Sequence, residues 1–198
     1  MRTLRFGRSF LFIALIVPAL GCGGKSTAQL ARELTDDDNK VRREAAHALG
    51  DMGPAAKEAV PNLVDSLGDK DAKLRRLSAK SLGRVGKDAK ESIPKLIEAL
   101  QDSDAKVRST AATALGKIHR QPDKVVPALS SALADSVPDV RRSAAMALGR
   151  FGTSAGAAVP SLQKALSDGN RQVRDAAASS LQRINAVDTP RGDREPAK

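Results

Sequence analysis

The sequence predicts an all-α protein, a right-handed solenoid of antiparallel helix pairs, on three observations. One pattern of apolar, small and charged residues returns every 33 residues over most of the 198-residue chain. Within each unit the apolar positions recur at three- and four-residue steps, which is the helical period. The chain has no Trp, no Tyr and four Phe, whereas β-sandwiches favour aromatic residues. These observations indicate helical hairpins that are too small to fold alone and gain stability by stacking.

The first segment, residues 1–21, has the features of a signal peptide. Arg2, Arg5 and Arg8 make its start basic, and an apolar run follows over residues 10–20. A run of that length is too short to span a bilayer as a helix, which needs about 20 residues. A basic start followed by a short apolar stretch is typical of secretion signals. We therefore expect this protein to be exported.

The end of the apolar run, residues 18–22, resembles the lipobox of bacterial lipoproteins. Gly21 and Cys22 fit that motif, while Ala19 and Leu20 depart from its usual residues. The resemblance implies a diacylglyceryl group and a further acyl chain on Cys22, and two or more chains anchor a protein stably. An ordinary signal peptide followed by an unmodified cysteine is the alternative. We expect a membrane-anchored lipoprotein on the periplasmic face or outer membrane of a bacterium, with residues 22–27 as lipidated cysteine and short tether.

Residues 28–184 contain the repeats: a half unit at 28–34, four full helix pairs at 36–166 and a terminal helix at 172–184. Each position of the 33-residue unit, compared across the repeats, forms a column. One column holds Val or Leu and is followed by Arg, at 41/42, 74/75, 107/108, 140/141 and 173/174. A leucine column is followed by glycine at 50, 83, 116 and 149, and Gln182 breaks that glycine series. Residues 185–198 are polar and are expected to be disordered.

The second unit illustrates why each repeat should form two helices. Asp71 is a suitable N-cap, since its carboxylate can accept an orphan backbone N–H of the first turn. An apolar stripe follows from Leu74 to Val85. Gly83 and Gly86 are expected to allow the left-handed backbone that ends a helix. Pro94 suits the first turn of the next helix, where no backbone N–H is needed.

The pattern D-x-x-x-x-V-R-x-x-A-A-x-A-L-G, as in residues 102–116, resembles HEAT repeats, and most closely the short variety of phycobilisome-lyase subunits. The resemblance covers residues 28–184. It implies a ladder of aspartates and arginines between successive repeats, with Asp36 matched to Arg42, Asp69 to Arg75, and so on. Ordinary surface pairing is the alternative that the spacing leaves open. The ladder positions are Asp36, Arg42, Asp69, Arg75, Asp102, Arg108, Asp135, Arg141, Asp168 and Arg174.

No catalytic or metal-binding constellation is present in the sequence. Cys22 is the sole cysteine, and His47 and His119 are the two histidines. The HEAT-like enzyme deoxyhypusine hydroxylase uses His-Glu iron ligands, and this chain has no His-Glu dipeptide. His47 belongs to a column of varied residues that is typical of a solvent-facing position, and His119 replaces a glycine at the turn between helices. We therefore expect no enzyme activity, no cofactor and no metal.

The chain has a net charge of +10. We expect this charge to meet an acidic partner or anionic lipid and not nucleic acid. The excess of basic residues is concentrated in residues 68–100. Nucleic-acid binding calls for a continuous basic stripe, and bases stack on aromatic side chains, which are nearly absent here. A bilin-lyase role would likewise call for aromatic residues around the chromophore, and an exported protein would not meet cytoplasmic phycobiliproteins.

The predicted function is that of a lipid-anchored, non-enzymatic scaffold that binds a protein partner. The alternative is an accessory subunit of an enzyme, related to the bilin lyases or to deoxyhypusine hydroxylase. In HEAT proteins the second helices usually line the concave surface, and here we take the proline-bearing helix of each pair as the second one. The expected partner-binding residues on these helices are Asn62, Asp65, Lys95, Glu98, Ser131 and Lys164.

Overall fold

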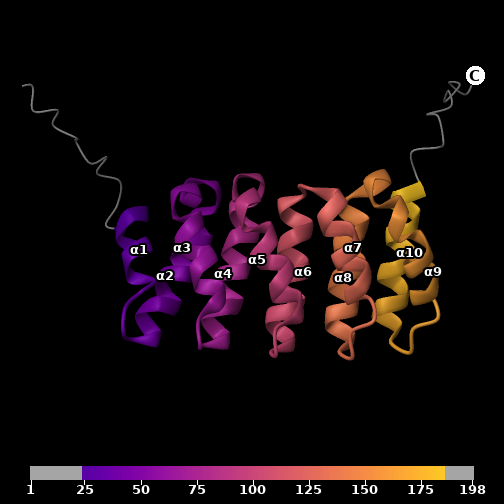
Figure 1. Cartoon of the computed structure of the whole chain (residues 1–198), viewed down its shortest axis with the longest axis horizontal. Helices are drawn as coiled ribbons and strands as arrows, with labels where there is room; N and C mark the ends of the chain where they lie inside the picture. The colour runs from indigo at the N-terminus through magenta and orange to yellow at the C-terminus, as the bar shows by residue number, and fades with distance from the viewer. Residues whose placement is uncertain (1–23, 186–198) are drawn as a thin grey trace, which may run out of the picture.

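The computed structural model describes residues 24–185, and these residues form helices and turns without a β-strand. The predicted signal peptide, the lipidation site at Cys22 and nearly all of the polar tail lie outside the described residues. No helix among residues 24–185 is long and apolar enough to cross a bilayer. The all-α solenoid expected from the sequence is therefore the observed fold (Figure 1).

The first helix, α1, is the second half of a repeat unit and is followed by pairs of helices. Ser26 caps α1 with a capping box, in which its side chain and that of Gln29 bond each other's backbone N–H. The α-helices are α1 (Thr27–Glu33), α2 (Asn39–Met52), α3 (Val60–Asp65), α4 (Ala72–Val85), α5 (Ile93–Glu98), α6 (Ala105–Ile118), α7 (Pro122–Ala132), α8 (Pro138–Arg150), α9 (Val159–Ala165) and α10 (Arg171–Asn185). Short 3-10 segments, Gly53–Ala59, Gly86–Ser92 and Gly152–Ala158, precede α3, α5 and α9.

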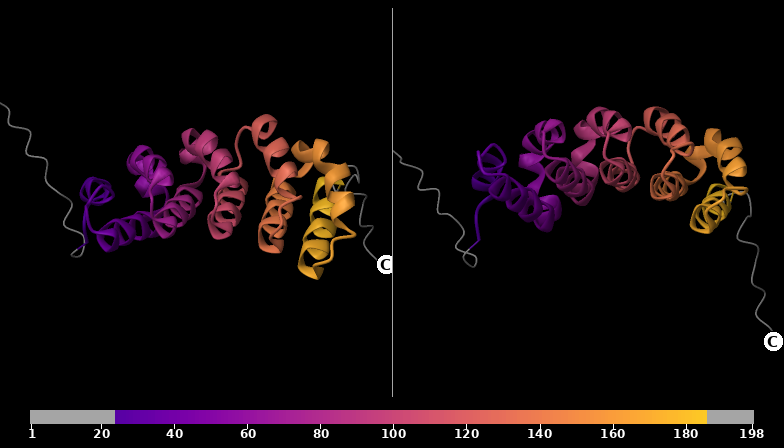
Figure 2. Two further views of the ribbon diagram at one scale, coloured as in Figure 1. Left: turned by 60° about the horizontal axis from the view of Figure 1, so that its bottom comes forward. Right: turned by 90° about the horizontal axis from the view of Figure 1, so that it is seen from below.

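The helices form two rows, and the stack is curved. The even-numbered helices α2 to α10 form one row and the odd-numbered helices form the other (Figure 2). Seen from below, the stack bends so that the even-numbered row lies on the inner side of the curve. Neighbouring even-numbered helices pack against each other along much of their length, whereas neighbouring odd-numbered helices contact each other sparsely.

Glycine makes the close spacing of the even-numbered row possible. A Cβ atom built on Gly83 would lie 2.9 Å from the Cα of Ala114, and one built on Gly116 would lie 2.9 Å from the Cα of Ala147. Gly50 and Gly149 face Ser81 and Ser180 in the same way. Because one row is packed more tightly than the other, the stack curves towards it.

The expectation that Gly83 ends a helix is wrong, because Gly83 lies inside α4 and is buried against α6. Gly86 does cap α4, with φ of 75°. His119 occupies the equivalent turn after α6 and adopts a left-handed backbone with φ of 51°. Its ring packs on Phe151, with ring centroids 4.8 Å apart.

The core runs between the two rows and is made mainly of leucine and alanine. Leu49, Leu82, Leu115 and Leu148 of the even-numbered helices are fully buried, and Leu96 of α5 is their counterpart in the odd-numbered row. Among the described residues α10 is the last helix, and it packs against α8 and α9. There Gln182 stands exposed at the position that glycine occupies in the four preceding helices.

Candidate functional site: ladder and inner face

Arginine side chains join each unit to the next through bidentate contacts with aspartate. Arg75 donates from Nε and Nη2 to the two carboxylate oxygens of Asp102, both at 2.7 Å. Arg108 contacts Asp135 in the same way at 2.7 and 2.9 Å. A further rung of this kind joins Arg141 and Asp168 at 2.7 and 2.8 Å. All of these side chains are largely buried, so solvent screens the pairs little.

The pairing within a unit differs from the one inferred from the sequence. Arg108 reaches Asp102, the aspartate of its own unit, through the backbone carbonyl, with Nη1 at 2.9 Å from the oxygen. It also donates to the carbonyl of Ser103 at 3.3 Å. The carboxylate of Asp102 belongs instead to Arg75 of the preceding unit, 27 residues earlier. Arg75, Arg108 and Arg141 therefore each tie their own turn to the turn of the following unit.

Each ladder aspartate also shapes its own turn. Oδ1 of Asp102 accepts the backbone N–H of Asp104 at 2.8 Å, and Asp104 then caps α6 through the N–H of Lys106. The hydrogen bond from Arg75 lowers the pKa of Asp102, against the opposing effect of burial. Arg108 and Arg141 lower the pKa values of Asp135 and Asp168 for the same reason.

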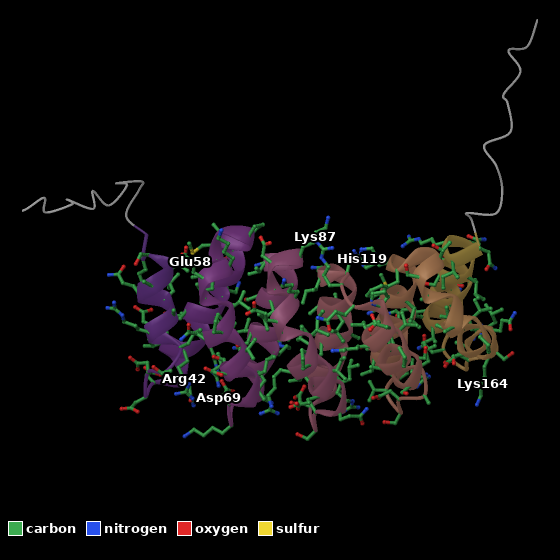
Figure 3. The ribbon with its side chains drawn as sticks, turned by 45° about the horizontal axis from the view of Figure 1, so that its top comes forward. Arg42, Glu58, Asp69, Lys87, His119 and Lys164 are labelled. Atoms are coloured by element: carbon green, nitrogen blue, oxygen red, sulfur yellow. The ribbon has the colours of Figure 1, made fainter. Side chains whose placement is uncertain are left out.

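The ladder is looser at its ends. The first rung, between Arg42 and Asp69, has contacts of 3.3 Å (Figure 3). Asp36 accepts the backbone N–H of Asp38, and among residues 24–185 no arginine of a preceding unit reaches its carboxylate. Arg174 bonds the carbonyls of Asp168 and its neighbour but meets no further carboxylate in the described part of the chain.

The lowered pKa values of the ladder aspartates predict a stability that declines in acid. A carboxyl group whose pKa is lower in the folded chain contributes its stabilisation above the unfolded pKa of about 3.9 and loses it as the pH falls through the folded pKa. The free energy of urea unfolding should therefore decline steeply below about pH 4. Asp135→Asn should be less stable than the parent at neutral pH and lose less stability on acidification. Asp65→Asn, on the exposed side of α3, is the control and should follow the parent. Parallel acid curves for Asp135→Asn and the parent would contradict this assignment.

The inner face of the even-numbered helices carries a large excess of positive charge. In each of these helices, five positions lie on the side opposite the fully buried residues: 40, 43, 44, 47 and 51 in α2, and the positions at 33-residue steps from them in α4, α6, α8 and α10. Eleven cations and four carboxylates occupy these positions over the five helices. The cations are Lys40, Arg43, Lys73, Arg76, Lys80, Arg84, Lys106, Lys117, Arg142, Arg150 and Arg183, and the carboxylates are Glu44, Asp51, Asp139 and Asp175.

Some inner-face cations are paired and others are free. Arg43 contacts Asp71, and Arg84 contacts Asp51. His47 lies beside the same Asp51, with Nδ1 2.8 Å from Oδ2. Several other cations meet no carboxylate within salt-bridge distance among the described residues, and they include Arg76, Lys80, Lys117, Arg150 and Arg183. Their charge is available to an external partner.

The six residues expected at the partner surface lie on the other row. Asn62, Asp65, Lys95, Glu98, Ser131 and Lys164 all belong to the odd-numbered helices α3, α5, α7 and α9, on the outer side of the curve. The expectation that these helices line the concave surface is therefore wrong, because the glycine-bearing helices pack more closely and take the inner side. Lys95 and Glu98 also contact each other at 2.6 Å. Across α1, α3, α5, α7 and α9 the four basic residues are balanced by four acidic ones.

A groove on the inner face lies between α8 and α10. It has a volume of about 360 Å³ and is lined by Arg142 and Met146 from α8 and by Asp175, Ala176 and Arg183 from α10, among others. Met146 is 47% exposed, an unusual state for a large apolar side chain in this protein. This groove and the inner-face cations are not among the residues predicted for the partner surface, although the glycines on the same helices are a signal that could have identified the inner row. No three His, Cys, Asp or Glu side chains of residues 24–185 come together as a possible metal site.

Comparison with known proteins gives a consistent result. A family model for HEAT repeats matches residues 27–95 and 93–182. The CpcE–CpcF complex of phycocyanin lyase from Nostoc sp. PCC7120 has a similar structure, with a TM-score of 0.72, 26% identity, and coverage of 86% of this chain and 69% of that chain. A designed armadillo repeat protein in complex with the peptide (KR)4 has a TM-score of 0.64 at 20% identity, over 80% of this chain and 82% of that one. An engineered protein has a TM-score of 0.63 at 23% identity, with coverage of 80% of this chain and 78% of that chain. The search of curated proteins found no matching relative.

Proposed function

Because the chain belongs to the HEAT-repeat family, we propose that it is a non-enzymatic scaffold that binds a protein partner on its inner face at the bacterial cell envelope. The observation that carries the proposal is the row of unpaired cations on the inner side of a curved stack, where one continuous surface spans five helices. Similar repeat structures are described with a bound peptide or in a complex of two chains. The solenoid provides the surface, and the exposed side chains provide the specificity.

The second part of the proposal is that a lipid on Cys22 holds the scaffold at a membrane. The support is the lipobox-like end of the apolar run and the short distance in sequence between Cys22 and the first turn of α1 at Thr27. A tether of so few residues reaches on the order of 15 Å by random-coil scaling. The stack would then stay next to the membrane, and partners would be captured there.

One capture experiment tests both parts. The full chain, expressed in a bacterium and extracted from membranes in mild detergent, should partition into the detergent phase and retain a defined protein partner. Cys22→Ser should move the chain to the aqueous phase, because the acyl chains are its only anchor in this proposal. Adding Gly24→Cys to that variant is the matched control, since it restores a thiol outside the motif, leaves the cap at Ser26 intact and should not restore partitioning. A wild-type chain with a free thiol would refute the anchor, and the absence of any specific partner would refute the scaffold.

The similarity to the CpcE–CpcF complex favours a second candidate, an accessory subunit of a lyase. In that case the purified protein should bind a linear tetrapyrrole and acquire visible absorbance. The mature chain has one aromatic residue, Phe151, and its side chain is 4% exposed. Stacking of a tetrapyrrole on aromatic rings is therefore not available, and we rank the scaffold first.

A further inference from the structure

The positive charge of the protein is concentrated on one surface. The outer row is balanced in charge, and the aspartates of the turns are neutralised in part by the ladder arginines. The inner face, by contrast, has nearly three cations for each carboxylate. A ligand that gained from all of these cations would have to be anionic along its length and cross several helices.

The spacing of the even-numbered helices suits an extended chain. Packed helices lie about 8 to 10 Å apart, and the Gly–Ala contacts place this row near the lower limit. An extended polypeptide in the polyproline II conformation rises about 3.1 Å per residue and has three residues per turn, so every third side chain points to the same side. An acidic side chain at about every third residue would therefore meet one helix after another, from α4 through α6 to α8. Twelve residues or so would cross the row.

The groove between α8 and α10 provides a place for an apolar side chain within this charged surface. Met146 forms its exposed apolar wall, and Ala176 lies on the opposite helix. The Nε of Arg142 is buried there and has no hydrogen-bond partner among the described residues. The outer end of the same guanidinium is accessible and pairs with Asp139 at 3.3 Å, so Arg142 brings positive charge to the groove.

We infer that the bound segment of the partner is an extended acidic polypeptide that crosses the inner face and places one bulky apolar side chain in the α8–α10 groove. This inference rests on the proposed scaffold function and adds the chemistry of its partner. A bilayer is disfavoured as the occupant because the inner face curves away from a flat surface. Single-stranded nucleic acid is disfavoured because none of the residues on this face is Phe, Tyr or Trp, and the single imidazole of His47 is held beside Asp51.

A fluorescent twelve-residue peptide with glutamate at every third position and one leucine near an end provides the probe. The full chain in detergent should bind it, with affinity that falls as salt is raised. Lys80→Glu with Lys117→Glu should weaken binding about tenfold, since two unpaired cations become like charges to the ligand. Lys95→Glu with Lys164→Glu, on the outer helices, is the matched control and should change the affinity less than about twofold.

The groove has its own test. Met146→Ser should weaken binding of the leucine peptide about fivefold and leave unchanged the binding of a peptide with serine in place of the leucine. Circular dichroism should show that all variants retain the helicity of the parent. The inference is overturned if a peptide with lysine in place of each glutamate binds equally well. It is also overturned if the inner-face and outer-face double variants change the affinity by the same factor. A third contrary result is that phosphatidylglycerol vesicles bind the inner face and the peptide does not. A captured partner that is insensitive to the inner-face variants would overturn this inference and leave the scaffold function standing.

Discussion

Replacing Gly116 by valine should destabilise the protein by about 3 kcal/mol, a large share of the 5 to 15 kcal/mol by which domains are typically stable. The added Cβ would lie 2.9 Å from both the Cα and the Cβ of Ala147, so α6 and α8 would have to separate. Replacing a glycine inside a helix normally gains about 0.5 to 1 kcal/mol, which the clash outweighs. Urea unfolding followed by circular dichroism measures the difference.

Gly156→Val is the matched control for this prediction. Gly156 lies in the 3-10 segment before α9, and no atom lies within 4 Å of a Cβ built there. Its variant should differ from the parent by less than about 1 kcal/mol, as surface substitutions usually do. If Gly116→Val were as stable as this control, the close approach of α6 to α8 at Gly116 would contribute little to the stability of the stack.

Arg108→Met should cost about 3 kcal/mol, because it leaves several partners without their donor. Asp135 would lose a bidentate contact in a largely buried position, and the carbonyls of Asp102 and Ser103 would lose hydrogen bonds. Methionine retains most of the apolar stem, so the loss reports on the guanidinium. Arg120→Met, at an exposed turn position, should leave stability nearly unchanged.

A double-mutant cycle measures the contact between Arg108 and Asp135 separately from the other contacts of these two residues. Arg108→Met and Asp135→Asn should each destabilise the chain, and the double variant should cost less than the sum by about 1 to 3 kcal/mol. Additive effects would mean that Arg108 acts through the carbonyls of its own turn and that the contact between units contributes little.

The repeat period predicted the fold well, because each column of the pattern imposes the same local environment in every unit. The period also identified the aspartates and arginines of the ladder. Matching each aspartate to the arginine of its own unit, however, did not give the arginine that contacts its carboxylate. Asp102 is six residues from Arg108 and 27 from Arg75, and only the stacked arrangement shows that the distant arginine is the one in contact. Sequence spacing favours the nearer of two candidates, whereas stacking brings successive turns side by side.

The side on which the stack curves was harder to predict. It depends on the difference in spacing between two rows, and each row taken alone looks like an ordinary amphipathic set of helices. The glycine column was visible in the sequence but was interpreted as a helix end at Gly83, where it marks a helix contact. The choice of Lys95 and Lys164 as partner surface came instead from the expectation that the second, proline-bearing helices line the concave side, whereas these helices lie on the outer side.

Gln182 gives α10 an outer surface unlike those of the other even-numbered helices, because it is exposed where α2, α4, α6 and α8 carry glycine. Glycine at that position would invite another helix to dock, and a long amide side chain prevents such an approach. The free side of α10 therefore lacks the notch through which α8 approaches α6, and a helix of a second copy could not come as close to it.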